Sequence, residues 1–297
     1  MKFDLSSINQ SFEEFKETVE KNNKADSRFW KIDKKQPKKY KIRFLPYINK
    51  DGKWKFFIQR YIHYLNSTVN GEMKFKSVLC PTSIGEKCHI CEKVSELYSS
   101  AFEVDHDAAR QRGKKLECLA NILVLSDPLN PENEGKVFIF KFGRMLRDKL
   151  LLAMGLQNED ELDEDEEKVN VFDPINGWDF KLVVSRKGDF PDYSQSEFIK
   201  KRKPLFGGDE EKIREILEQT YDLDEFLDPE LYPDYNETKV IYKSMFGKID
   251  DIENSNKEKI EDEIEDDVPD EEIIDETEDV TDVDVDDDDD LDDLFDE

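Results

Sequence analysis

The residues with the clearest capacity for chemistry lie between positions 63 and 91. His63, Cys80, Cys88 and Cys91 include three of the four cysteines and one of the three histidines in the 297-residue chain. A Cys-x-x-Cys pair presents two thiolates from one turn, and tetrahedral Zn²⁺ takes four nitrogen or sulfur ligands. The spacing predicts one structural Zn²⁺ ion, because four protein ligands leave no open position for a catalytic water.

Other interpretations of these residues stay open. His89 lies between the two cysteines of the pair and is the alternative to His63 as the fourth ligand. A Cys-x-x-Cys pair is also a redox motif, but redox proteins place it in a βαβ context, whereas the sequence here is basic, aromatic and strand-like. In a third interpretation the cysteines are buried thiols without a metal.

Charge is distributed unevenly along the chain. The formal net charge is −29, yet residues 248–297 hold 28 acidic and 3 basic residues, whereas residues 1–247 hold 45 acidic and 41 basic. Residues 31–60 alone carry 11 basic and 2 acidic side chains. A nearly neutral body with a basic stretch and a polyanionic tail suggests nucleic acid on the stretch and competition from the tail.

Hydrophobic periodicity predicts a body made mainly of strands. Strands are expected at 38–48, 53–58, 118–125, 136–142 and 178–184, the third buried on both faces, and helices at 94–102, 146–156 and after Asp209. In the first strand, Tyr40, Ile42 and Phe44 form one face, and Lys39, Lys41 and Arg43 form a solvated face. The order predicts an α+β protein with an OB-fold-like barrel core and a zinc-binding subdomain at about 60–100.

The two ends of the chain are expected to lie outside a core at 21–247. The apolar periodicity of residues 1–20 predicts an arm with an amphipathic helix. This helix docks either on its own domain or on a neighbouring protomer. Residues 248–297 cannot bury enough apolar surface to fold and predict a disordered tail. Its apolar cluster of Leu291, Leu294 and Phe295 is suited to capture by a basic, grooved partner.

Several function classes are disfavoured. The N-terminus has no apolar targeting segment and no apolar run reaches bilayer length, so we expect a soluble protein of a reducing cytosol. The sequence has no Gly-rich phosphate loop and no His-x-x-x-His pair, so we expect no enzyme. An interaction scaffold whose acidic tail imitates DNA stays open as the alternative to nucleic-acid binding.

One long segment closely resembles a block of the single-stranded DNA-binding proteins of T-even-type bacteriophages: residues 120–150, ANILVLSDPLNPENEGKVFIFKFGRMLRDKL. The proteins of this family destabilise DNA helices during replication. Other matching segments follow in the same order: KIRFLP at 41–46, the His63/Cys80/Cys88/Cys91 set, FKLVVSRKGDFPDYSQSEF at 180–198, and LDDL at 291–294. The resemblance covers most of residues 40–200 and the extreme C-terminus.

The resemblance implies an OB-fold core with a zinc-bearing subdomain and a cleft for single-stranded DNA. It implies an anionic tail that contacts replication, recombination and repair proteins, self-association along DNA, and a place in the cytoplasm of an infected bacterial host. The implied DNA-binding residues are the aromatic Phe140, Phe190 and Tyr193 and the basic Arg43, Lys114, Lys115, Lys141 and Arg144.

The chain departs from the family in three places. The family's Tyr-Trp pair before Ala-Asn-Ile-Leu is Cys118-Leu119 here, so part of the stacking platform is missing unless Trp30, Trp54 or Tyr61 compensates. The basic motif of the family's N-terminal arm is reduced to Lys2 and a Ser-Ser pair. The spacing from the histidine to the next cysteine is also several residues longer.

Overall fold

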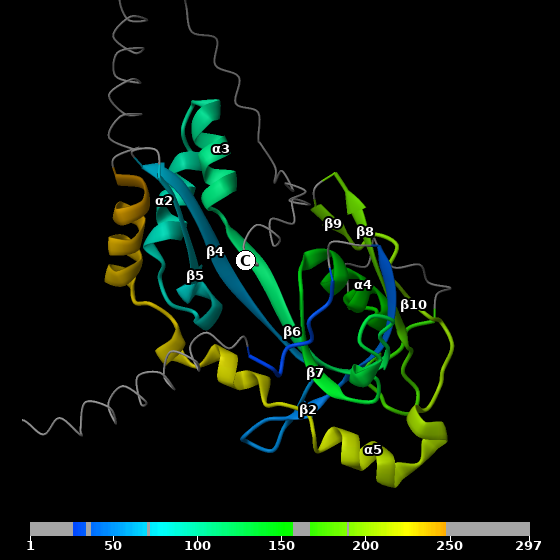
Figure 1. Cartoon of the computed structure of the whole chain (residues 1–297). Helices are drawn as coiled ribbons and strands as arrows, with labels where there is room; N and C mark the ends of the chain where they lie inside the picture. Colours follow the sequence, from blue (N-terminus) through cyan, green and yellow to red (C-terminus); the bar gives the residue numbers. More distant parts are fainter. Residues whose placement is uncertain (1–25, 34–36, 70–71, 157–166, 189, 248–297) are drawn as a thin grey trace, which may run out of the picture.

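The computed structural model describes residues 26–33, 37–69, 72–156, 167–188 and 190–247, which form an α+β structure rich in strands (Figure 1). The described strands are β1 (Lys38–Leu45), β2 (Tyr47–Ile48), β3 (Trp54–Lys55), β4 (Phe57–Val69), β5 (Glu72–Leu79), β6 (Lys114–Ser126), β7 (Val137–Phe142), β8 (Phe180–Lys187), β9 (Phe190–Asp192) and β10 (Glu197–Phe198). The described helices are α2 (His89–Tyr98), α3 (Glu103–Arg112), α4 (Arg144–Met154), α5 (Glu210–Leu217) and residues 235–247, with 3₁₀ turns η1 (Pro81–Ile84), η2 (Pro131–Asn133), η4 (Leu205–Gly208), η5 (Leu223–Leu227) and η6 (Pro229–Leu231).

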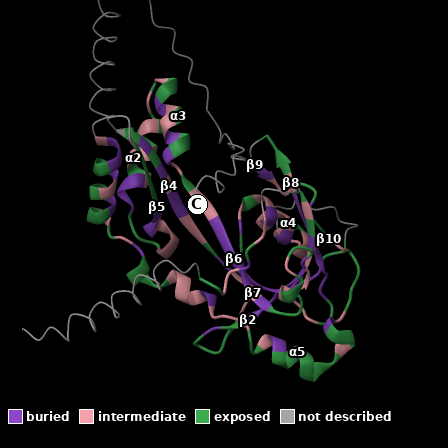
Figure 2. Cartoon of the chain, viewed as in Figure 1, coloured by how far each residue is buried: buried purple, intermediate pink, exposed green. Residues whose placement is uncertain are grey.

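Strand β6 is the centre of the sheet. One of its edges pairs antiparallel with β4 over residues 114–120 and with β1 over 121–126, and the other edge pairs with β7 over 118–123. Residues 117–124 are buried without a break, as the largely apolar sequence from Cys118 to Leu125 predicts (Figure 2). The sheet therefore has its most protected strand where the sequence is most uniformly apolar.

The sheet does not close into the barrel expected from the sequence. Among the described strands, pairing runs along an open path β10–β8–β1–β6–β4–β5, with β7 and β9 attached to β6 and β8. Closure would require the end strands to pair with each other. Instead, β4 extends beyond β6, and its second half pairs with β5 in a hairpin that leads to Cys80.

One face of the sheet, here called the front face, buries the main core. On β6 it carries Cys118, Ala120, Ile122 and Val124, which alternate along the strand and join one cluster of buried side chains. Helix α4 covers this cluster through Leu146 and Leu150. Aromatic rings fill much of it: Trp30, Tyr40, Phe44, Phe140, Phe142, Phe172, Trp178, Phe180 and Phe198.

The opposite face, here called the back face, is covered by α5 and η5. Asp209 caps α5 by accepting from the backbone N–H of Lys212 at 3.2 Å, as predicted, and Ile213 and Ile216 are buried against the sheet. Leu119 and Leu223 lie in a neighbouring cluster on this face. No helix within the described residues is long and apolar enough to cross a membrane.

The far end of the sheet carries a separate structure, here called the metal lobe. It consists of the second half of β4, β5, η1, α2, α3 and the helix at residues 235–247 (Figure 1). Its small core joins Leu65, Val78, Cys80, Cys88 and Ile90 to three side chains of the C-terminal helix: Tyr242, Met245 and Phe246. Residues more than 150 positions downstream of the cysteines thus complete the lobe.

Three local expectations differ from the structure. Residues 53–58 were expected to return as a strand beside the first, but only Trp54–Lys55 pairs with Tyr47–Ile48, and β4 pairs with β6. Helix α2 begins at His89, earlier than position 94, and α3 was not expected. The arm at 1–20 and the tail at 248–297, with Leu291, Leu294 and Phe295, lie outside the described residues.

Candidate metal centre and nucleic-acid interface

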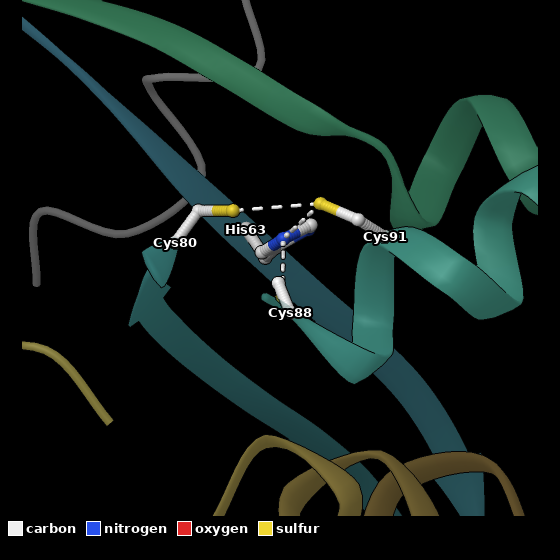
Figure 3. Close-up of side chains that lie close together, drawn as sticks. All are labelled: His63, Cys80, Cys88 and Cys91. Carbon is white, nitrogen blue, oxygen red and sulfur yellow. Dashed lines mark hydrogen bonds between the residues drawn. The ribbon is translucent and has the colours of Figure 1, made fainter. Parts of the chain in front are cut away.

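Four side chains from three elements converge in the metal lobe (Figure 3). His63 comes from β4, Cys80 follows β5, and Cys88 and Cys91 lie at the start of α2. The ligand atoms all lie within 4.8 Å of one another. Cys91 is half-buried, and the other three are buried. The arrangement brings together the residue set predicted from spacing.

The side chain of His63 is held in one orientation. Its Nδ1 lies 3.0 Å from the carbonyl oxygen of Arg112 and donates a hydrogen bond to it, so Nε2 is the nitrogen that faces the cysteines. Such a carbonyl contact is the usual outer support of a metal-bound histidine. Cys80 has a comparable support, because the hydroxyl of Thr82 lies 3.2 Å from its Sγ.

The distances fit a four-coordinate metal ion. Nε2 of His63 lies 3.5 Å from Sγ of Cys91 and 3.6 Å from Sγ of Cys88, and Sγ of Cys80 lies 3.4 Å from Sγ of Cys91. Tetrahedral Zn²⁺ bond lengths correspond to edges of about 3.6 Å between nitrogen and sulfur and about 3.8 Å between sulfurs. The cluster can therefore hold a metal ion.

His89 is excluded as a ligand in this structure. Cys88 and Cys91 are three residues apart and lie on one side of the first turn of α2, whereas the intervening His89 points elsewhere. Its Nδ1 lies 3.1 Å from the hydroxyl of Tyr235, and its backbone N–H donates to Thr238 Oγ1 at 3.2 Å. His89 thus anchors the C-terminal helix.

Contacts within the cluster shift the pKa values of Cys80, Cys91 and His63. Hydrogen bonds from the thiols of Cys88 and Cys91 lower the pKa of Cys80, and the same contact with the Cys80 thiolate raises the pKa of Cys91. Burial works to lower the pKa of His63, but hydrogen bonds to Cys80 and Cys88 outweigh it and raise that pKa to about 9. A bound metal would therefore have to displace protons from this cluster.

The fourth cysteine takes no part in the cluster. Cys118 is fully buried on the front face of β6, and burial raises the pKa of its thiol to about 12. Leu119 is fully buried on the back face. Neither position where the resemblance implies a Tyr-Trp pair offers a surface for stacking here.

Two of the eight expected DNA-binding residues are buried. Arg43 is fully buried; its Nε and Nη2 donate to Asp179 Oδ1 at 3.0 and 2.7 Å, and Nη2 also donates to the carbonyl of Lys203 at 2.7 Å. Phe140 is 2% exposed and packs against Trp30 in the main core. Neither side chain is placed to touch DNA.

The reason for the burial of Arg43 is tertiary. The alternation in β1 does place Arg43 opposite Ile42 and Phe44, but residues 173–179 fold over that face. Gly177 allows the close approach: a Cβ there would lie 3.1 Å from Arg43 Nη1 and 2.4 Å from the carbonyl oxygen of Asp173. A pattern of lysines and arginine alone does not reveal such a cover.

The three expected lysines lie on different faces of the sheet. Lys114 is on the front face opposite His63, whereas Lys115, opposite Ile62, points to the back face because side chains alternate along a strand. Lys141 is also on the back face, where its Nζ lies 3.4 Å from Glu117. The other oxygen of Glu117 accepts from Arg60 Nε at 2.7 Å. One continuous groove cannot use all three lysines in the same way.

The remaining expected residues lie on α4, on β9 and directly after β9. Arg144 is exposed at the start of α4, and Phe190 is half-buried in β9. Tyr193 packs in part against the main core, and Lys149 of α4 donates to the carbonyl of the adjacent Ser194 at 2.9 Å. These contacts fix the turn between β9 and β10 beside α4.

Sequence reasoning missed two features of this region. The helix at 235–247 supports the metal lobe: Arg112 Nη1 donates to the hydroxyl of Tyr242 at 2.7 Å, and its guanidinium lies over the ring of Phe246. The recurrence of Thr238, Tyr242 and Met245 at spacings of three and four signals its buried side. The second feature is Arg147, whose Nη1 lies 3.5 Å from Gln59 Oε1 on the front face. Nothing in the sequence around Arg147 distinguishes it from the other basic residues.

Comparison with known proteins assigns the family. Residues 38–246 match the model of the family described as gp32 DNA binding protein like. The chain is 28% identical over 208 residues to the single-stranded DNA-binding protein of Enterobacteria phage T4, and 28% identical over 221 residues to that of Enterobacteria phage T2. Each match covers 69% of this chain and 65% of the relative. The chain belongs to the gp32-like family of DNA-binding proteins.

Proposed function

We propose that this protein binds single-stranded DNA without sequence preference. The observation that carries the proposal is the family match over residues 38–246, together with two relatives named as single-stranded DNA-binding proteins. The match includes the metal ligands and the whole front face of β4 and β6. The surface chemistry of the front face is consistent with this function.

Basic side chains on the front face would bind phosphates. Lys114 and Arg144 are exposed, and Arg147 reaches Gln59 on the same face. Each phosphate that is neutralised releases counterions, so the logarithm of the affinity falls by roughly 0.7 per phosphate per decade of salt. Affinity should therefore decline steeply as salt rises.

Partly exposed aromatic rings would stack on bases. Phe190 and Tyr193 are half-buried, so part of each ring remains at the surface. Every base has a π-face, and stacking therefore tolerates any sequence. Bases in a duplex already stack on each other, which makes them unavailable to such rings. The protein should favour single strands and lower the melting temperature of a duplex.

We assign one structural Zn²⁺ to His63, Cys80, Cys88 and Cys91. Bound there, Zn²⁺ would join β4, the loop after β5 and the start of α2 through four protein ligands, with no position left for a catalytic water. The protein's own contribution is to orient His63 through the Arg112 carbonyl and to bury the thiolates. A role as an enzyme has no support in this site.

The finer assignments follow the family resemblance. We propose a role in viral replication, recombination and repair in the cytoplasm of an infected bacterial host. In the proposed division, residues 1–20 form an arm that can join protomers along DNA, 21–247 form the DNA-binding core, and 248–297 form a disordered tail that recruits partner proteins. The OB fold rests on the resemblance alone, because the described strands pair along an open path.

The test is direct binding by the full-length chain. Fluorescence anisotropy would compare a labelled oligo(dT) with a hairpin duplex of equal charge at two salt concentrations. We expect tight binding of oligo(dT), weaker binding of the hairpin, and loss of both as salt rises. Equal affinity for the two would contradict a single-strand preference.

A scaffold with an acidic DNA-mimicking tail is the second candidate, carried by the 28 acidic residues of 248–297. In that case the full-length chain would bind no nucleic acid at either salt concentration. It would instead associate with basic proteins through its tail.

A further inference from the structure

We propose that Tyr61 is a base-stacking residue of the DNA-binding surface, and that the metal-binding loop holds it in position. This inference rests on the proposed single-strand binding. It answers where the stacking surface lies in a chain whose Cys118 and Leu119 are both fully buried. Of the other aromatic candidates, Trp30 is buried in the core, and Trp54 lies on β3 beside α5, away from the front face.

Tyr61 lies on the front face, where a DNA strand would pass between α4 and the metal lobe. Gln59, Tyr61 and His63 are every second residue of β4 and therefore share this face. Gln59 contacts Arg147 of α4, and His63 belongs to the candidate metal centre. Its neighbour on β6 is Leu116, which is followed on the same face by the buried Cys118. The ring of Tyr61 is half-buried, so part of it remains at the surface.

A cation is already positioned at this ring. Nζ of Lys114 lies 4.2 Å from the centre of the Tyr61 ring, within the range of a cation–π contact. The same Nζ donates to Thr82 Oγ1 at 3.0 Å, which fixes the ammonium beside the loop. Lys114 also lines a cavity of about 320 Å³ next to His63 and Cys91. A base that stacks on this face takes the place of the ammonium, which can then neutralise the adjacent phosphate of the same strand.

The metal-binding loop fixes the backbone of Tyr61 from the other side. The backbone N–H of Tyr61 donates to Ser83 Oγ at 2.7 Å, and its carbonyl accepts from the backbone N–H of the ligand Cys80 at 2.8 Å. Thr82, which holds Lys114, is the neighbour of Ser83 and also contacts Cys80 Sγ. Loss of order in this loop would release the ring and the cation together.

The test uses three variants of the full-length chain and anisotropy with labelled oligo(dT). Tyr61→Leu keeps apolar bulk but removes the aromatic plane, and we expect affinity to fall about 5- to 150-fold, the range for one lost stacking contact. Tyr61→Phe keeps the ring and should bind within about twofold of the original protein. The matched control is Trp54→Leu, which removes a 54% exposed ring elsewhere and should leave affinity unchanged.

The outcomes separate this inference from the proposed function. If the original protein fails to bind oligo(dT), both are overturned. If it binds and Tyr61→Leu binds equally well, only the inference is overturned. Metal content and thermal unfolding of Tyr61→Leu show whether a loss of affinity accompanies a damaged lobe.

A second measurement does not depend on the folding of a variant. The unmodified protein is bound to an oligonucleotide with 5-iodouracil, irradiated and digested, and the adducts are located by mass spectrometry. Photocrosslinking of 5-iodouracil favours stacked aromatic residues, so we expect an adduct at Tyr61. Adducts at other aromatic residues with none at Tyr61 would overturn the inference.

Discussion

The main sheet and the metal lobe are stabilised by different means. Among the described residues, the main core joins twenty buried side chains from β1, β6, β7, β8, β10, α4 and nearby loops, whereas the core of the metal lobe joins eight, two of which are cysteines of the candidate metal cluster. A small apolar core contributes little stability, and small structures commonly depend on a metal or another crosslink. The sheet can be expected to fold through burial alone, and the lobe only when the proposed metal ion is bound.

Strand β4 makes the two regions interdependent. Its first half pairs with β6 in the sheet and its second half with β5 in the lobe, and residues 62 and 63 pair with both. A ligand of the metal centre, His63, is thus part of the sheet register. The contrast between the regions is therefore testable through substitutions that affect one region and spare the other.

The largest effect is expected from Cys88→Ser, which removes one ligand. Structural zinc sites contribute roughly 10–16 kcal/mol of apparent binding energy, so the variant should lose stoichiometric metal and the ordered lobe. Metal content and amide hydrogen exchange would check both. His89→Gln is the matched control, because its side chain lies outside the cluster, and it should retain metal. Uniform unfolding of lobe and sheet in Cys88→Ser would contradict the contrast.

The next effect concerns the buried ion pair of the main sheet. Arg43→Met leaves Asp179 buried without its closest partner, and a global destabilisation of about 3–5 kcal/mol is expected in denaturant unfolding. Lys41→Met is the control, because Lys41 is 40% exposed and lies 3.6 Å from the same carboxylate. Folded Arg43→Met should keep its metal and its affinity for oligo(dT). A selective loss of DNA affinity would show that Arg43 contributes to DNA binding despite its burial.

We expect the main sheet to lose stability at acidic pH because Asp127 becomes protonated. Burial alone would raise the pKa of Asp127, but hydrogen bonds from Asn133, Trp30 and two backbone N–H groups outweigh it and lower that pKa. A lowered folded-state pKa gives stability that is present above the unfolded value of about 3.9 and is lost as pH falls below it. Asp127→Asn should lower the free energy of unfolding by about 1–3 kcal/mol at neutral pH. It should also make the fall of this free energy at acidic pH, the acid limb, less steep.

Urea unfolding at several pH values would measure this effect. Asp51→Asn, in an exposed turn, is the control and should leave both the neutral stability and the acid limb unchanged. An acid limb equally steep in Asp127→Asn would assign the acid sensitivity to other carboxylates.

The smallest effect distinguishes the two faces of β6. Lys114→Ala should reduce the salt slope of oligo(dT) binding by roughly 0.7, the value for one phosphate contact on a single strand. Lys115→Ala, one position along the strand but on the opposite face, should leave the slope unchanged. Equal effects of the two substitutions would contradict the assignment of DNA binding to the front face alone.

Local patterns were sufficient for much of the fold. The run at 118–125, apolar except for Asn121, predicted the central strand, the spacing after Asp209 predicted α5, and the Asn49–Gly52 turn is present with Gly52 at a φ of 75°. Such elements are predictable because strand alternation, helix periodicity and capping depend on neighbours in the chain. Helix α3 was missed because its sequence is polar, with little apolar periodicity.

By itself, the sequence determined which residues can coordinate a metal, where charge concentrates and which segments become strands. Only the tertiary structure decided that His63 and not His89 joins the cysteines, that Arg43 is covered by residues 173–179, and that residues 235–247 complete the metal lobe. The physical reason is the same in each case. Ligand type and alternation are local properties, whereas burial depends on what distant segments place against a side chain.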